Sequence, residues 1–278
     1  MASETDILSA LATYREHIGR VNHRAMSTLI PQIEAASMDD PDLFECPEEE
    51  EEMCVEYVLG LVGASKHSTR PPIERTSDLL KNWDVLAPQL ALDGASVNAD
   101  SEWRAANRKA YTSAILQGLG RFGCPTGTWA LPRDFEILMR HVDSLEGPGW
   151  YMFRDIGEKL VFWEGWGQSE YGVRDESVKA RCKSGQCIIE HTVEVDEDYD
   201  VAGGWACGEK GNESTCYAIY SRPKGGKSEV WSWRYVAFMG QFGTRIFEDI
   251  IAVLDWYHQR GQPTEEEFTV TAEEVFSP

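Results

Sequence analysis

The chain is 278 residues long and 42% hydrophobic, which is enough to bury the core of one large domain or two ordinary ones. Its 47 acidic residues outnumber its 26 basic residues and give a formal net charge of −21. This charge argues against nucleic acid or an anionic membrane surface as the main ligand, because both would be repelled, and it would attract a basic protein partner.

Helices are predicted in the first half of the chain, where apolar residues recur at helical spacing between clusters of turn-forming residues. The amphipathic runs cover residues 8–21, 53–61, 79–90, 103–115 and 135–142. Asp100 or Ser101 would cap the fourth of these helices, and Pro132 would lie near the first turn of the fifth. Residues 1–100 are therefore predicted to be an all-helical N-terminal extension.

A run of five glutamates, Glu48 to Glu52, precedes the second helical run. Such a run is typical of a solvated loop or of the acidic first turn of a helix, where carboxylates meet the positive end of the helix dipole. The alternative is a docking strip for Lys and Arg side chains of a partner.

Beyond residue 148 the apolar period shortens to two, which predicts an antiparallel sheet. The expected strands cover residues 150–155, 158–163, 186–195, 215–222 and 228–236. In the last of them Trp231, Trp233 and Tyr235 alternate with Ser232 and Arg234, so one face is expected in the core and the other in water.

A final helix is predicted over residues 243–260, where an unbroken apolar stripe at helical spacing would lie across the sheet. The residues from Gly261 onward are acidic and poor in core-forming side chains, which predicts a loosely held tail over 261–278. The sequence thus indicates an α+β protein whose helical region, 1–100, precedes a sheet domain at 101–260.

Several segments of the second half are similar to the SUKH superfamily. They are LPRDFEILMRHVDSLEGPGW, the hairpin that begins at Trp205, the strand VWSWRYV and the closing segment FGTRIFEDIIAVLDWY. The resemblance covers roughly residues 100–260; it does not account for residues 1–100, and residues 167–187 are longer than the family pattern. It implies a non-catalytic α+β domain that binds another protein, as in yeast regulators of cell-wall synthesis and bacterial immunity proteins that neutralise toxins.

Cys207 and Cys216 flank a glycine-studded polar stretch, which predicts a β-hairpin with positive-φ residues at Gly208, Gly211 and Asn212. Free cysteine packs as a small hydrophobe, so we expect these thiols to be buried. Two alternatives stay open, a redox pair and a zinc site. The four thiols that a zinc site would use are Cys182, Cys187, Cys207 and Cys216. No metal and no cofactor is predicted.

Enzyme motifs are missing from the sequence: it has no phosphate-binding loop, no G-x-S-x-G elbow and no H-E-x-x-H pair. His191 lies on the apolar face of the predicted strand 186–195, as a hydrogen-bonded core histidine would. A non-enzymatic protein is therefore expected. The alternative is an enzyme with a divergent pocket on the sheet face around His191, Tyr171 and Arg174.

Tryptophans beside glycines, at the end of the strand predicted over residues 158–163, are candidates for interface anchors, although core packing is the alternative for each of them. Four nearby carboxylates would form an acidic rim that steers a basic partner. The predicted partner-binding residues are Trp163, Trp166, Tyr171, Asp196, Glu197, Asp198 and Asp200. The expected function is that of a protein-interaction or regulatory protein, of the immunity or the cell-wall-regulatory kind.

The seven cysteines do not form the dense pattern of a secreted disulfide scaffold. The N-terminus lacks the basic start and the apolar core of a signal peptide, and no stretch approaches eighteen uncharged apolar residues. We therefore expect a soluble protein of the cytoplasm, with the nucleus as the alternative and no membrane association.

Overall fold

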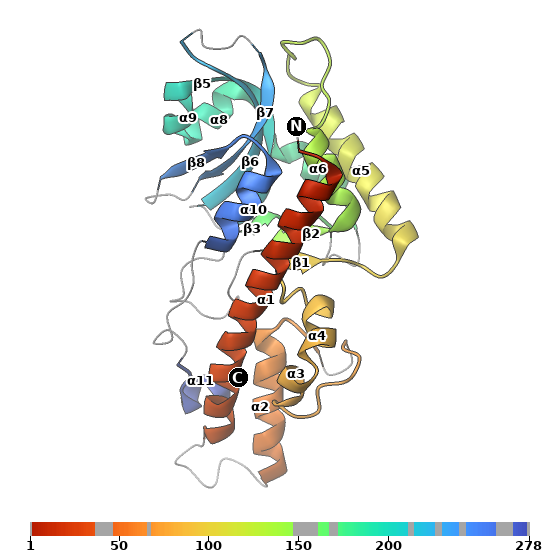
Figure 1. The fold of residues 1–278 in the computed structure, drawn as a ribbon, viewed down its shortest axis with the longest axis vertical. Helices are drawn as coiled ribbons and strands as arrows, with labels where there is room; N and C mark the ends of the chain where they lie inside the picture. Colours follow the sequence, from red (N-terminus) through yellow and green to blue (C-terminus); the bar gives the residue numbers. More distant parts are fainter. Residues whose placement is uncertain are drawn as a thin grey trace. The chain divides into compact units, whose positions relative to one another are not determined.

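The computed structural model describes residues 2–36, 47–65, 68–146, 161–166, 172–210, 214–225, 230–238, 243–259 and 269–276. The chain divides into two compact units (Figure 1). The sheet unit comprises Met1–Tyr14, Ala95–Gly147 and Leu160–Tyr257, and the helical unit comprises Arg15–Gly94, Pro148–Lys159 and His258–Pro278. The chain begins in the sheet unit and returns to it at Ala95, whereas the sequence predicted a single boundary near residue 100. The α+β fold class is confirmed.

The helical unit is built from the greater part of the long first helix and four shorter helices. They are α1 (Glu4–Ala35), α2 (Pro47–Leu61), α3 (Asp78–Lys81), α4 (Trp83–Gln89) and α11 (Ala272–Phe276). One apolar cluster holds the unit together, with Leu29 and Ile33 of α1 packed in the same core as Val58 of α2. The run predicted over 79–90 is two helices, because Asn82 ends α3 and precedes α4.

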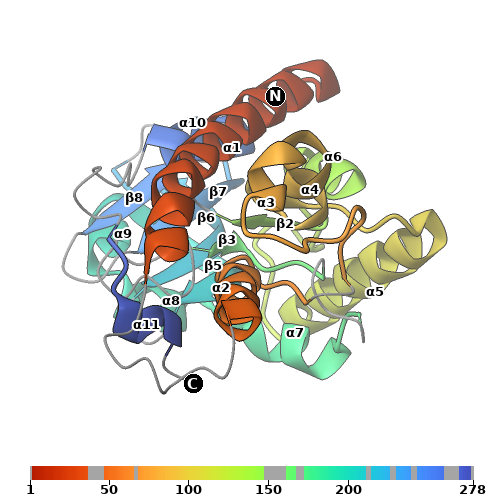
Figure 2. The same cartoon turned by 90° about the horizontal axis from the view of Figure 1, so that it is seen from below.

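The expectation of a loosely held tail is wrong for residues 272–276. They form α11, and its Val275 and Phe276 are buried in the same cluster as α2 (Figure 2). Thr271 and Glu274 form a reciprocal capping box at its start, in which the Thr271 amide donates to the Glu274 carboxylate at 2.8 Å. Apolar packing and a cap thus dock this end of an acidic segment, and Val270 and Ala272 pack against the same cluster.

The sheet unit combines a small sheet with a larger one. The small sheet runs β1 (Ala95–Ser96), β2 (Ser144–Glu146), β3 (Val161–Trp163). The larger sheet is antiparallel and runs β4 (Cys182–Ser184), β5 (Tyr199–Lys210), β6 (Ser214–Pro223), β7 (Ser232–Phe238), β8 (Thr244–Phe247). The helices of the sheet unit are α5 (Ser101–Leu119), α6 (Arg133–His141), α7 (Asp175–Arg181), α8 (Gly185–His191), α9 (Val193–Asp198) and α10 (Ile250–Gln259), besides the first part of α1. The two-residue strand β1 interrupts the region predicted as all helical.

Two helix starts predicted from the sequence, a cap at Asp100 and a proline at 132, are present in the sheet unit. The Asp100 carboxylate accepts the amides of Glu102 and Trp103, both at 2.9 Å, and so starts α5. Pro132 directly precedes α6, whose side chains Phe135 and Leu138 are fully buried. The strands predicted over 215–222 and 228–236 correspond to β6 and β7.

Two expected elements differ in the structure. Residues 186–195, predicted as a strand, form the helices α8 and α9, because Ser184 caps α8 and because Ile188 and Val195 both pack onto the sheet. The first part of the helix predicted over 243–260 is instead the strand β8, which pairs with β7, and α10 begins only at Ile250. The strand predicted over 150–155 lies outside the described residues.

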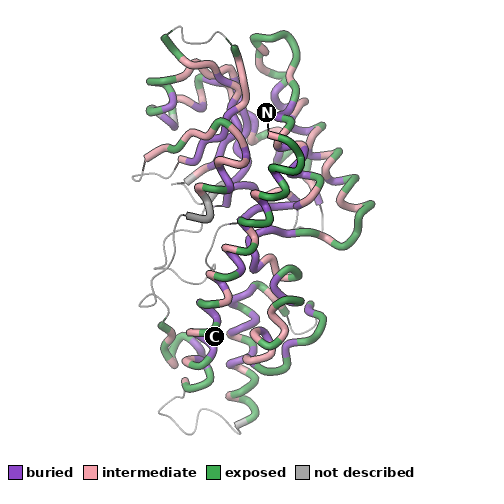
Figure 3. Tube along the Cα trace, in the orientation of Figure 1, coloured by how far each residue is buried: buried purple, intermediate pink, exposed green. Residues whose placement is uncertain are grey.

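The larger sheet has two unlike faces, and its central strands are buried through their middle (Figure 3). Ile219 and Val236 lie on one face, under Ile188 of α8 and Val195 of α9. Trp205 and Tyr235 lie on the other face, where the ring of Phe135 is 5.6 Å from Trp205 and 6.4 Å from Tyr235 between centroids. None of the helices in the described part of the chain has the length and apolarity needed to cross a bilayer.

Candidate partner-binding surface

The two tryptophans predicted as interface anchors are core residues, which corrects that prediction. Trp163 is 0% exposed and Trp166 is 2% exposed, and their rings meet edge to face with centroids 5.2 Å apart. The chain reverses at Gly165, whose φ of +54° favours glycine, and the Trp166 amide then donates to the Asp143 carbonyl at 3.0 Å. The glycines beside these tryptophans therefore mark a turn back into the core. Tyr171 lies outside the described residues.

The four predicted carboxylates lie together at the end of α9 and the start of β5. We call Asp196, Glu197, Asp198 and Asp200 the acidic strip. Asp196, Glu197 and Asp198 are exposed, and Asp200 is half-buried. Asp196 pairs with Lys224 at 2.8 Å and Asp200 pairs with Arg222 at 2.9 Å.

The ion pairs of the acidic strip are exchangeable. The two charged side chains of the Asp200–Arg222 pair are each 41% exposed, and those of the Asp196–Lys224 pair are 38% and 51% exposed, so water screens both pairs. Four carboxylates and two cations leave the local charge at −2. A cation of a partner could therefore replace either internal cation at little free-energy cost.

A second group of aromatic residues lies where the sequence analysis expected only a core face. Tyr220 of β6 and Trp233 of β7 are cross-strand neighbours with ring centroids 5.2 Å apart. Trp231 stacks on Tyr220 at 5.8 Å, and Trp129 lies 6.1 Å from Trp233. All four rings are half-buried, and we call them the aromatic cluster. Tyr235, two residues further along β7, is 1% exposed, so the strand leaves the core between Tyr235 and Trp231.

Arg222 joins the acidic strip to the aromatic cluster. Its guanidinium lies 5.1 Å from the centroid of the Trp231 ring, while its Nε pairs with Asp200. Asp200 and Arg222 face each other in the register of β5 and β6, which brings residues far apart in the sequence together. The acidic strip and the aromatic cluster are thus one continuous surface. This surface could have been predicted only from the pairing of β5 with β6. No local sequence motif carries that information.

A pocket of about 400 Å³ opens at the edge of the aromatic cluster. One wall is aromatic, from Tyr220, Trp231 and Trp233, and the other carries Arg133 and three carboxylates, Asp134, Glu248 and Asp249. Three carboxylates and one guanidinium leave this pocket with a net negative charge. Aromatic walls can contact the aliphatic stem of a Lys or Arg side chain while carboxylates bind its charged end.

Hydrogen bonds fix the carboxylates of this pocket in place. Asp134 accepts the Tyr235 hydroxyl and the Ile250 amide, both at 2.9 Å. Glu248 pairs with the buried Arg234 at 2.9 Å, yet its own side chain is 66% exposed. Asp249 caps α10 by accepting the Ala252 amide at 2.9 Å. The negative wall of the pocket is therefore preorganised by the fold.

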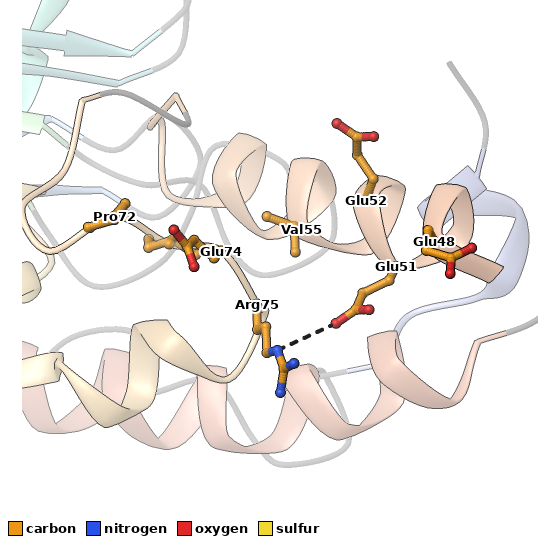
Figure 4. Close-up of a pocket in the computed structure, with 8 residues that line it drawn as sticks. Glu48, Glu51, Glu52, Val55, Pro72, Glu74 and Arg75 are labelled. Atoms are coloured by element: carbon orange, nitrogen blue, oxygen red, sulfur yellow. Dashed lines mark ion pairs between the residues drawn. The ribbon is translucent and has the colours of Figure 1, made fainter. Parts of the chain in front are cut away.

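A second acidic groove, of about 520 Å³, lies in the helical unit beside the start of α2. Figure 4 shows Glu48, Glu51 and Glu52 of α2 on this groove, with Arg75 opposite and 3.9 Å from Glu51. The glutamate run does begin α2, as expected from its composition. The positive end of the helix dipole accounts for carboxylates at this position without a ligand.

The hairpin predicted around Cys207 and Cys216 is present as β5 and β6, and both cysteines are fully buried, reduced thiols. The Cys207 thiol donates to the Cys216 carbonyl at 3.3 Å. Burial raises the pKa of Cys207 to about 12, so its thiol is neutral at physiological pH. Gly211 and Asn212 lie outside the described residues. No group of three or more His, Cys, Asp or Glu side chains within the described ranges could hold a metal ion.

Native alkylation tests this description of the thiols. At pH 8, iodoacetamide is expected to modify the half-buried Cys124 and Cys187 at least about a hundredfold faster than Cys207 and Cys216, because alkylation requires an accessible thiolate. Peptide mass spectrometry over a time course measures each rate, and labelling in urea supplies the fully accessible reference. Equal rates at Cys207 and Cys124 in the native protein would show that the hairpin thiols are reactive.

The residues of the alternative enzymatic pocket are only partly described. Arg174 is exposed and directly precedes α7, whereas Tyr171 and the side chain of His191 lie outside the described residues. The chain has no match among protein-family models, curated proteins or solved structures.

Proposed function

We propose that this chain is a non-enzymatic interaction or regulatory protein that binds a basic segment of another protein through the acidic strip and the aromatic cluster. The observation that carries the proposal is the continuity of these two features through Arg222, beside a pocket with aromatic and carboxylate walls. Aromatic side chains supply buried contact area at interfaces, and complementary charge supplies specificity and fast association.

Binding would proceed by exchange of cations. The formal charge of −21 attracts a basic partner at long range, and this attraction weakens as salt screens it. At contact, Lys or Arg side chains of the partner replace Lys224 and Arg222 on the acidic strip, and one enters the pocket between the aromatic rings and Glu248. The SUKH-like assignment and the cytoplasmic location remain part of the proposal, and the order of α6, the antiparallel strands and α10 is compatible with the resemblance.

Neutralising the acidic strip tests the proposal. The probe is a fluorescein-labelled peptide of alternating Arg, Lys and Leu residues, and its anisotropy is followed on titration with the full chain. The variant combines Asp196→Asn, Glu197→Gln, Asp198→Asn and Asp200→Asn. We expect it to bind about tenfold more weakly or worse, because it lacks the carboxylates that pair with the peptide.

A matched variant separates this effect from the loss of net charge. Asp84→Asn, Glu102→Gln, Asp175→Asn and Glu190→Gln remove the same four charges from exposed positions elsewhere. Its affinity should stay within about twofold of the wild-type value, since distant exposed charges are screened. Equal losses in the two variants would mean that the peptide responds to overall charge, and the proposed surface would be rejected.

A further inference from the structure

A groove of opposite charge lies between α5 and α6 of the sheet unit, with a volume of about 530 Å³. Arg108 and Lys109 of α5 line one wall, and Arg140 of α6 lines the other. Glu136 is the acidic residue on the groove, so its net charge is positive although the chain as a whole is strongly acidic. Because this groove is positive in a protein that is negative overall, it is distinct from the acidic surface proposed above.

Two of these cations have no counter-ion among the residues that the structure describes. Neither Arg108 nor Lys109 makes an ion pair with any described residue, whereas the neighbouring Arg104 pairs with the buried Asp143 at 2.8 Å. Arg140 lies 3.8 Å from Glu4, a distance at which an exposed pair contributes little. In a chain with nearly two acids for each base, groove cations that pair with no described acid are positioned to bind an anion from outside.

The floor of the groove indicates which anion it would take. Leu116 lines the groove beside the cations and is half-buried, whereas Met139, also on the lining, is 1% exposed and offers a ligand almost no surface. The lining positions of α5 fall at helical spacing on one face, and they include the hydroxyl of Thr112. A small inorganic anion would use the cations and leave Leu116 uncovered. A polynucleotide carries a charge on every phosphate, so the negative field of the whole chain would repel it more strongly than a short peptide with a few carboxylates.

We infer that the α5–α6 groove binds an acidic peptide segment, whose carboxylates pair with Arg108, Lys109 and Arg140 and whose apolar side chains contact Leu116. The inference does not depend on the proposed function, because it concerns other residues and a ligand of opposite charge. Both walls are helical and rest on the buried core of the unit, so the groove is formed before the ligand arrives.

The test uses a short fluorescein-labelled peptide of Glu and Leu residues and the full chain, with anisotropy as the readout. Arg108→Gln combined with Lys109→Gln is expected to weaken binding about tenfold, because both ion pairs to the peptide are lost. The control, Arg20→Gln with Lys81→Gln, removes two exposed cations of the helical unit and should leave the affinity within about twofold.

Two further measurements identify the kind of ligand. Leu116→Asn should weaken peptide binding several-fold if Leu116 contacts the peptide. If the site recognises charge alone, this substitution should leave the affinity unchanged. Inorganic phosphate and single-stranded RNA serve as competitors and should displace the peptide only at much higher concentration. Equal weakening by the groove variant and the control, no binding at low salt, or displacement by phosphate or RNA at peptide-like concentrations would each overturn the inference.

Discussion

Replacement of Asp134 by alanine is expected to lower the free energy of unfolding by about 3–5 kcal/mol, because the carboxylate holds together three parts of the sheet unit. It belongs to α6, and it accepts the Tyr235 hydroxyl of β7 and the first amide of α10, at Ile250. Tyr235 is 1% exposed, so its hydroxyl would lose its acceptor in a dry environment. The negative charge at the start of α10 would also be lost.

Urea unfolding followed by near-ultraviolet circular dichroism measures this effect. Asp175→Ala is the matched control, since Asp175 is also an aspartate in the first turn of a helix but is exposed, and it should cost less than about 1 kcal/mol. In a Tyr235→Phe background the Asp134→Ala substitution should cost about 1–2 kcal/mol less, because one of its hydrogen bonds is already gone. A loss at Asp134 no larger than that at Asp175 would contradict the proposed link.

Sequence reasoning predicted the helices well where the pattern was long and the caps were explicit. The run predicted over 8–21 lies within the 32-residue α1, and α5 follows an aspartate that caps it. The hairpin and β7 were also predictable, because turn residues bounded runs of aromatic and β-branched side chains. In these elements the local preference and the tertiary structure agree.

The segment over residues 186–195 shows where local pattern fails. Its apolar residues fit a strand by alternation, but Ile188 of α8 and Val195 of α9 each face the sheet from a helix. Burial against β5, β6 and β7 decides between the two patterns, and this information is not in the segment. The cap at Ser184 was the one local signal for a helix.

The candidate site was predicted in part for the same reason. The acidic strip could be found from composition, because consecutive carboxylates cannot be buried. The aromatic anchors could not be predicted from the sequence. Trp163 and Trp231 both lie near turn residues, and they differ only in which side chains cover them in the folded protein. Trp163 is enclosed by Phe135 and Tyr111, whereas Trp231 lies at the open end of β7 against Arg222.

Gly208 was predicted to supply a positive φ in the hairpin turn, and its role is different. It lies within β5, at a bulge between Ala206 and Gly208, and its φ is not positive. A Cβ atom at this position would overlap the carbonyl oxygens of Val161 and Phe162 in β3. The Cys207 carbonyl next to it accepts the Glu164 amide at 3.1 Å, so the two backbones are held together. Glycine is required here by close approach of two backbones.

Gly208→Ala is therefore expected to destabilise the protein by at least about 3 kcal/mol, because backbone atoms cannot rotate away as a side chain would. Thermal unfolding measures the change, and Gly123→Ala is the control, since a Cβ atom at Gly123 meets no heavy atom within 4 Å. Gly208→Asn separates the two explanations. Asparagine tolerates a positive φ, so a glycine needed only for the turn could be replaced by asparagine with a small loss of stability. If close approach to β3 is the reason, the asparagine substitution should destabilise the protein at least as much as the alanine substitution.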